Sequence, residues 1–137
     1  MLQETHDILI VDDDRDIRYM MQSILKHEGY QTMTCASADE LSDIMSVIRP
    51  AAIIMDMLLS GTDGKDICRS LKKKESTKHI PVMMVSAHPD AEFLCREAGA
   101  DDFLEKPFEI DVFINKTRML IKEAARNDRI MQNEKAE

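Results

Sequence analysis

Cysteine, glycine, proline and tryptophan are all scarce in this sequence. The chain of 137 residues has three cysteines, four glycines, four prolines and no tryptophan. Cys35, Cys68 and Cys95 lack the paired CxxC spacing of zinc sites, and their odd number argues against a disulfide framework. We therefore expect three buried thiols in a reducing compartment, the cytoplasm.

Long apolar runs are also missing. No segment approaches the ~20 apolar residues that a membrane-spanning helix needs. The N-terminal stretch MLQETHDILIV has no basic region, and its apolar run ends at Asp12, so it does not resemble a signal peptide. We expect no association with a membrane.

Positive charge is in deficit. Eighteen Lys and Arg residues oppose 26 Asp and Glu residues, which gives a net charge of −8. A chain this acidic is repelled by nucleic acid phosphates, so we expect no direct nucleic acid binding. The hydrophobic fraction of 44% and the charged fraction of 32% are ordinary for a globular protein of about one domain.

Two hydrophobic periods alternate along the chain. Short, nearly continuous apolar runs predict strands that are covered on both faces. Stripes with helical spacing separate them, and Gly29 and Gly99 follow two of these stripes as C-terminal caps do. Five such repeats predict an α/β fold with a parallel sheet and helices on both faces. The expected strands are Asp7–Val11, Thr32–Cys35, Ala52–Met55, Val82–Val85 and Asp102–Leu104.

The C-terminal end allows two interpretations. Residues 1–125 carry the repeats and form the expected domain, whereas residues 126–137 are polar. We favour a frayed tail or linker stub for 126–137. The alternative is a longer last helix, because a seam with 4-3-4-3-4 spacing continues through Phe113, Thr117, Leu120, Ala124, Asn127 and Met131.

Chemistry-bearing residues follow four of the expected strands. In an open α/β sheet, ligands bind beyond the carboxyl ends of the strands. Asp12, Asp13 and Asp14 follow the first strand and Asp56 the third, and Ser86 and Lys106 follow the fourth and fifth. Asp14 is expected to cap the next helix. The remaining carboxylates offer only oxygen ligands, which favours Mg²⁺ over zinc.

Four segments give the chain its resemblance to a known family. They are ILIVDDD at 8–14, IIMDMLLSGTDG at 53–64, PVMMVSAH at 81–88 and GADDFLEKPF at 99–108. Together they resemble the receiver domain of two-component response regulators, over about residues 8–125. The resemblance implies a flavodoxin-like (βα)5 fold with strand order 2-1-3-4-5.

The resemblance also implies a function and a set of site residues. Asp56 would accept a phosphoryl group from a sensor histidine kinase or a phosphotransfer protein. Asp12, Asp13, Asp56 and the backbone carbonyl of Leu58 would hold Mg²⁺. Lys106, which precedes a cis proline bond in the family, would contact the phosphoryl oxygens. The chain would be a switch with self-catalysed chemistry only, not an enzyme acting on other substrates.

The same resemblance implies how the signal would leave the domain. Ser86 and Phe103 would form the switch pair, and the surface of the fourth helix, fifth strand and fifth helix would bind an unidentified effector. Two positions depart from the family pattern: Phe103 is commonly Tyr, and Ser60 is usually Pro, which we expect to loosen its loop. Two alternatives compete: a haloacid-dehalogenase-like phosphatase using Asp12, and a phosphorylation-independent interaction domain in which neither aspartate is modified.

Overall fold

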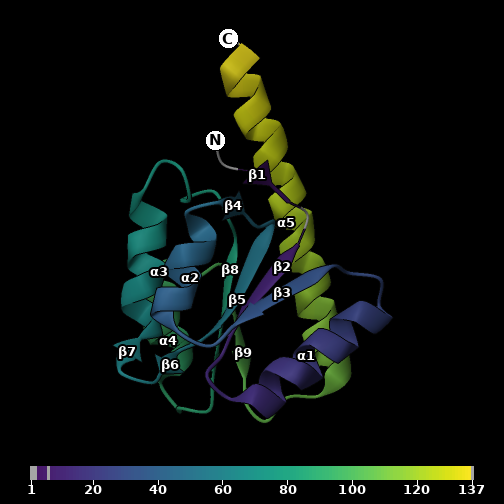
Figure 1. Ribbon diagram of the computed structural model, residues 1–137, viewed down its shortest axis with the longest axis vertical. Helices are drawn as coiled ribbons and strands as arrows, with labels where there is room; N and C mark the ends of the chain where they lie inside the picture. The colour runs from purple at the N-terminus through teal and green to yellow at the C-terminus, as the bar shows by residue number, and fades with distance from the viewer. Residues whose placement is uncertain (1–2, 6, 137) are drawn as a thin grey trace.

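A five-stranded parallel sheet forms the centre of the molecule. The computed structural model describes residues 3–5 and 7–136. The sheet has the order β3-β2-β5-β8-β9, with every neighbouring pair parallel (Figure 1). Counted along the chain, its five strands follow the expected order 2-1-3-4-5, so the predicted fold is confirmed. The strands are β2 (Ile8–Val11), β3 (Thr32–Cys35), β5 (Ala52–Asp56), β8 (Val82–Ser86) and β9 (Asp102–Glu105).

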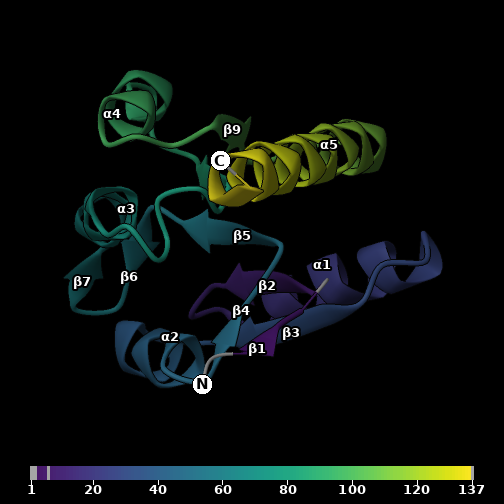
Figure 2. The same ribbon diagram turned by 90° about the horizontal axis from the view of Figure 1, so that it is seen from above.

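Five helices cover both faces of this sheet. Figure 2 shows α1 and α5 on one face, and α2, α3 and α4 on the other. Each face therefore has its own apolar core, one around Ile10, Leu25 and Phe113 and the other around Leu9, Met84 and Cys68. The three cysteines are buried free thiols, as predicted, and burial raises the pKa of Cys35 and Cys68 to about 11. The helices are α1 (Arg15–His27), α2 (Ala38–Met45), α3 (Gly64–Lys73), α4 (Ala91–Glu97) and α5 (Ile110–Ala136).

Local signals fix where several helices begin and end. The Asp14 carboxylate accepts hydrogen bonds from the backbone N–H groups of Asp16 and Ile17, so the predicted cap of α1 is confirmed. Gly29 and Gly99 have φ values of 92° and 102°, a conformation that favours glycine.

Four two-residue strands were not predicted. β1 (Gln3–Glu4) pairs with β4 (Ile48–Arg49) in parallel, and β6 (Leu58–Leu59) pairs with β7 (Thr62–Asp63) as a hairpin. Two residues are too few to show a period, so hydrophobic patterning cannot reveal such strands. The β6–β7 hairpin matters most here because it follows Asp56 directly.

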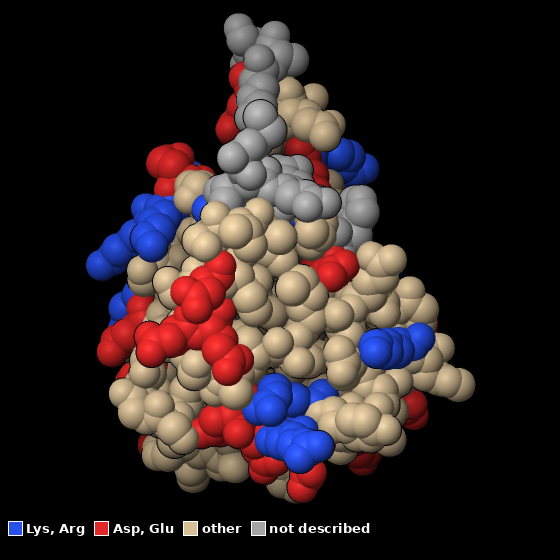
Figure 3. Space-filling model, in the orientation of Figure 1, with Lys and Arg blue, Asp and Glu red and all other residues tan. Residues whose placement is uncertain are grey.

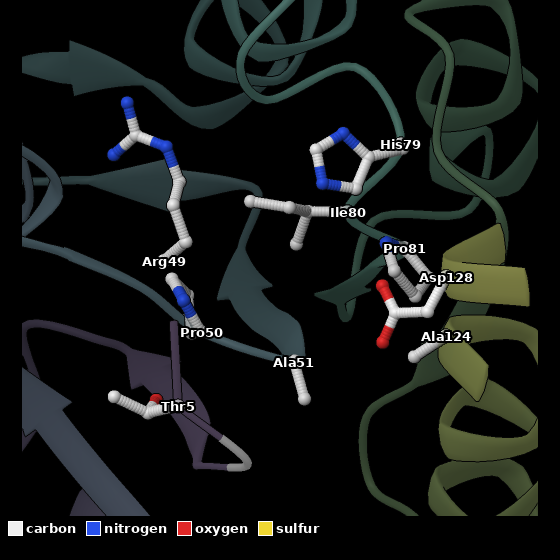
Figure 4. A pocket seen from close by; sticks show the side chains of 9 residues that line it. All are labelled: Thr5, Arg49, Pro50, Ala51, His79, Ile80, Pro81, Ala124 and Asp128. Carbon is white, nitrogen blue, oxygen red and sulfur yellow. The ribbon is translucent and has the colours of Figure 1, made fainter. Parts of the chain in front are cut away.

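The frayed tail that we favoured is wrong for residues up to Ala136, because α5 continues to that residue; Glu137 lies outside the described residues. The side chain of Asn127 donates a 2.8 Å hydrogen bond to the carbonyl of His79, which attaches the helix to the loop before β8. A hollow of about 30 Å³ lies between this loop and α5, and His79, Pro81 and Asp128 are among the residues that line it (Figure 4). The seam named above is buried or half-buried from Phe113 to Met131.

Candidate functional site

The residues that were predicted to act together meet at the carboxyl edge of the sheet. Parallel strands end on one side, so Asp12 after β2, Asp56 at the end of β5, Ser86 at the end of β8 and Lys106 after β9 all face this edge. Their contacts define the site, and each carboxylate has a different environment.

Asp12 is the buried carboxylate of the site. The residue is 2% exposed. Its Oδ1 atom accepts a hydrogen bond of 2.8 Å from the backbone N–H of Asp14, and its Oδ2 atom lies 3.3 Å from Nζ of Lys106. A buried charge is costly unless it is paired and hydrogen-bonded, and these two contacts meet that requirement.

Asp13 is exposed, and Ser60, in the turn of the β6–β7 hairpin, holds its side chain by hydrogen bonds. Its Oδ2 atom accepts hydrogen bonds from the backbone N–H of Ser60 at 3.0 Å and from the Ser60 hydroxyl at 2.6 Å. The Ser60 hydroxyl is the main reason that the pKa of Asp13 lies below its usual range. Ser60 therefore connects this loop to Asp13, a contact that the expectation of a looser loop did not include.

Asp56 combines partial burial with access to solvent, since its side chain is 15% exposed. Burial raises the pKa of Asp56; the positive charge of Lys106 opposes that shift, and the negative charge of Asp12 adds to it. The backbone N–H of Leu58 donates to Oδ1 of Asp56 at 3.4 Å. A carboxylate with a perturbed pKa in such a cluster is typical of a functional site.

Lys106 brings an ammonium group to this edge. Its Nζ atom lies 3.3 Å from Asp12 Oδ2 and 3.5 Å from Asp56 Oδ2, so it faces two carboxylates at once. The backbone N–H of Lys106 donates to the carbonyl of Ser86 at 2.9 Å, which fixes where the lysine side chain starts. The Lys106–Pro107 peptide bond is cis, as the resemblance implied.

The carboxylates are close enough to share a metal ion. One oxygen from each of Asp12, Asp13 and Asp56 lies within 4.8 Å of the other two, among the residues that the structure describes. The donors are all carboxylate oxygens, the hard ligands that Mg²⁺ prefers, so the residues fit this ion. Leu58 lies in β6, next to the cluster in sequence, and is 59% exposed.

Ser86 and Phe103, the expected switch pair, lie on adjacent strands. Ser86 is 4% exposed, and its hydroxyl accepts a hydrogen bond of 3.0 Å from the backbone N–H of His88. Phe103 is 7% exposed and belongs to the apolar core on the α4 side of the sheet. In this structure the ring is therefore inward.

Gly64, the last residue of the segment 53–64, lies against the backbone of Asp56, a role that the sequence analysis did not assign to it. A Cβ atom at this position would lie 2.5 Å from the backbone oxygen of Asp56 and 2.9 Å from that of Met57. The backbone N–H of Gly64 also donates to the Met57 carbonyl at 2.7 Å. Only glycine allows α3 to start this close to the chain that carries Asp56.

The family follows from a comparison with known sequences. Residues 8–118 match the family described as "Response regulator receiver domain". The chain belongs to this family. The match covers every strand of the central sheet and all the candidate site residues. A haloacid-dehalogenase-like phosphatase, the first alternative, is therefore wrong.

Relatives and solved structures agree with the family. The chain is 31% identical to "Transcriptional regulatory protein YxdJ" of Bacillus subtilis over 93% of its own length and 56% of the relative. It is 29% identical to "Response regulator MprA" of Mycolicibacterium vanbaalenii over 88% of its own length and 52% of that relative. It thus spans about half the length of these curated relatives. The crystal structure of the receiver domain of NtrX from Brucella abortus is similar, with 35% identity, a TM-score of 0.75, and coverage of 85% of this chain and 98% of that one.

The surface and helices add two further observations. On the face in Figure 3, Lys and Arg side chains occur in small separate groups between Asp and Glu side chains. None of the helices within the described ranges has both the length and the apolar composition to cross a bilayer.

Proposed function

We propose that Asp56 is the phosphoacceptor of this receiver domain, and that a sensor histidine kinase or a phosphotransfer protein in the cytoplasm is the donor. The observation that carries this proposal is the position of Asp56. It ends a central strand, is partly open to solvent, and lies 3.5 Å from Lys106 and within 4.8 Å of two further carboxylates.

The chemistry of transfer follows from these groups. An oxygen of the Asp56 carboxylate attacks the phosphorus atom in line, and the bond from phosphorus to the imidazole nitrogen of the donor phosphohistidine breaks. The imidazole keeps the electron pair and takes up a proton. Lys106 faces the Oδ2 side of Asp56 and offsets the negative charge that spreads over the phosphoryl oxygens. The backbone amide of Leu58 orients the other oxygen.

Asp12, Asp13 and Asp56 would hold Mg²⁺, together with the carbonyl of Leu58. When bound, the ion would supply positive charge that offsets the charge of the transferring group. Asp12 is the most buried of these residues, and it contacts the Asp14 amide and the Lys106 ammonium group. The chain then catalyses only its own phosphorylation and dephosphorylation.

The output is a change in the surface formed by α4, β9 and α5. Ser86 would donate its hydroxyl hydrogen to a phosphoryl oxygen on Asp56. In the present structure the oxygen of the same hydroxyl accepts a hydrogen bond from the His88 amide, and it can do both at once. A shift of Ser86 toward the phosphoryl group would open space behind it. Phe103, on the adjacent strand, is the bulky side chain that would fill this space. The exposed side chains of Phe93 and Val112, on α4 and α5, give this surface apolar contacts for an effector.

Intact-protein mass spectrometry after incubation with acetyl phosphate and Mg²⁺ tests the proposal. We expect one added phosphoryl group in the wild type and none in Asp56→Ala. The matched control is Asp66→Ala, which removes an exposed carboxylate on α3 and should label like the wild type. Unchanged labelling of Asp56→Ala contradicts the assignment, and absence of labelling in the wild type favours a phosphorylation-independent interaction domain.

A further inference from the structure

Ser60 makes two contacts with one oxygen of Asp13. Its backbone N–H and its hydroxyl both donate to Oδ2, at 3.0 and 2.6 Å, although 47 residues separate Ser60 from Asp13. Hydrogen bonds to a carboxylate are among the stronger ones in proteins. Proline can make neither contact, because it has no N–H and no hydroxyl.

These contacts leave the carboxylate able to bind a cation. An ionised carboxylate has about four lone-pair sites, and the two donors of Ser60 occupy sites on one oxygen. The other oxygen, Oδ1, is then held in a fixed direction. Carboxylates that ligate metals are commonly hydrogen-bonded in this way by residues that do not themselves touch the ion.

The position of Ser60 in the chain adds a second link. Ser60 follows β6 (Leu58–Leu59) directly, so the segment that supplies the proposed Leu58 carbonyl ligand is the one bonded to Asp13. One residue thus connects the ligand after β2 with the ligand after β5. Loss of the connection lets both the Asp13 side chain and the hairpin sample other conformations.

We propose that Ser60 is a positioning residue for the Mg²⁺ site, which holds Asp13 and the β6–β7 hairpin in the arrangement that the ion requires. This inference rests on the proposed function, because it assumes that the carboxylate cluster binds Mg²⁺. Its physical basis is preorganisation: a ligand already fixed loses less conformational entropy when the ion binds. Ser60 itself does not contact the ion.

The experiment is a titration of the full chain with MgCl₂, followed by the backbone amide NMR signals of residues 57–64. Four proteins are compared: the wild type, Ser60→Ala, Ser60→Thr and Thr62→Ala. Ser60→Thr keeps the hydroxyl, and Thr62→Ala removes a hydroxyl from the same hairpin outside the Asp13 contact. Urea unfolding of each protein confirms that all four are folded during the titration.

We expect Ser60→Ala to raise the Mg²⁺ dissociation constant about tenfold, the lower end of the range for such partners, because the N–H bond remains. Ser60→Thr should restore affinity, and Thr62→Ala should match the wild type. In an Asp13→Asn background, Ser60→Ala should have no further effect. Unchanged or tighter binding by Ser60→Ala overturns the inference and leaves the proposed function intact. Absence of Mg²⁺ binding by the wild type overturns both.

Discussion

Lys106 and Asp56 are 50 residues apart in the chain, yet the lysine Nζ atom lies 3.5 Å from Oδ2 of the aspartate. The same atom lies 3.3 Å from Oδ2 of Asp12, which is almost fully buried. One ammonium group therefore serves two carboxylates. It supports the fold by pairing a buried charge, and it lies where a phosphoryl group on Asp56 would need positive charge.

Lys106→Met tests the structural half of this arrangement. Without Mg²⁺, the variant leaves the buried Asp12 charge without this ion pair, so we expect the free energy of unfolding to fall by about 3 kcal/mol, the lower end for a broken buried pair. Added Mg²⁺ should stabilise the variant more than the wild type, because the ion replaces the missing charge. Thermal unfolding with and without MgCl₂ measures both effects. Lys78→Met, which removes an exposed pair with Glu75, is the control; it should cost less than about 1 kcal/mol, and an equal loss in both variants contradicts the account.

The raised pKa of Asp56 predicts a pH dependence of stability. A carboxyl group whose pKa is higher in the folded state binds its proton more tightly there, so its contribution to stability falls as pH rises through that raised pKa. In Mg²⁺-free buffer, we expect Asp56→Asn to be more stable than the wild type at pH 7, because Asn avoids the cost of holding a charge at this partly buried position. The difference should shrink below the ordinary aspartate pKa of 3.8.

Asp13→Asn provides a control, because its effect on stability at neutral pH should be opposite to that of Asp56→Asn. The pKa of Asp13 is lowered, chiefly by the Ser60 hydroxyl, so ionised Asp13 stabilises the fold above its ordinary pKa and loses that contribution at acidic pH. Urea unfolding from pH 3 to pH 8 should show the two variants diverging from the wild type in opposite directions. The same sign for both rejects this description of the electrostatics.

Gly64→Ala should damage both the fold and the site. A Cβ atom 2.5 Å from the Asp56 carbonyl cannot be accommodated without moving backbone, and we expect a loss of about 2 kcal/mol. Because the displaced backbone carries Asp56, phosphorylation by acetyl phosphate should also slow. Gly29→Ala is the control, because it makes the same substitution at another glycine. There the new Cβ atom would strain a backbone with positive φ but would contact no neighbouring atom. It should lower stability and leave the phosphorylation rate unchanged; a slowed rate in this control would show a general effect of instability.

Ser86→Ala tests the coupling from the site to the effector surface. Beryllofluoride, a phosphoryl mimic, should shift NMR signals from Asp56 to Phe103 and residues 91–98 in the wild type. In Ser86→Ala the shifts should stay near Asp56, and Ser86→Thr, which keeps the hydroxyl, should restore their spread. Equal spread in all three proteins removes Ser86 from the mechanism and makes Phe103 a fixed core residue, as its burial allows.

The site residues that directly follow a buried strand could be predicted from the sequence. Runs such as Ile8–Val11 and Ala52–Met55 are apolar throughout, so each shows where a buried strand stops and a carboxylate follows. Parallel pairing then brings Asp12, Asp56 and Lys106 to one edge. The cap formed by Asp14 could also be predicted, because it depends only on residues two and three positions away.

The remaining features depend on contacts between distant segments. The bonds from Ser60 to Asp13 and the close approach of Gly64 to Asp56 exist only after the β6–β7 hairpin folds against the sheet. The polar end of α5 has the composition of a frayed tail, and Asn127 holds it through a carbonyl 48 residues away. The pattern of neighbouring residues along the chain does not predict contacts of this kind between distant segments.

Chemical trapping of the phosphorylated residue tests the central claim most directly. The protein is phosphorylated with acetyl phosphate and Mg²⁺, reduced with borohydride and digested, and the peptides are sequenced by mass spectrometry. Borohydride converts an aspartyl phosphate to homoserine and leaves free aspartate unchanged, so the product marks the acceptor. Asp56 as the phosphoacceptor predicts homoserine at position 56 alone. Homoserine at position 12 or 13, with Asp56 unmodified, would contradict it.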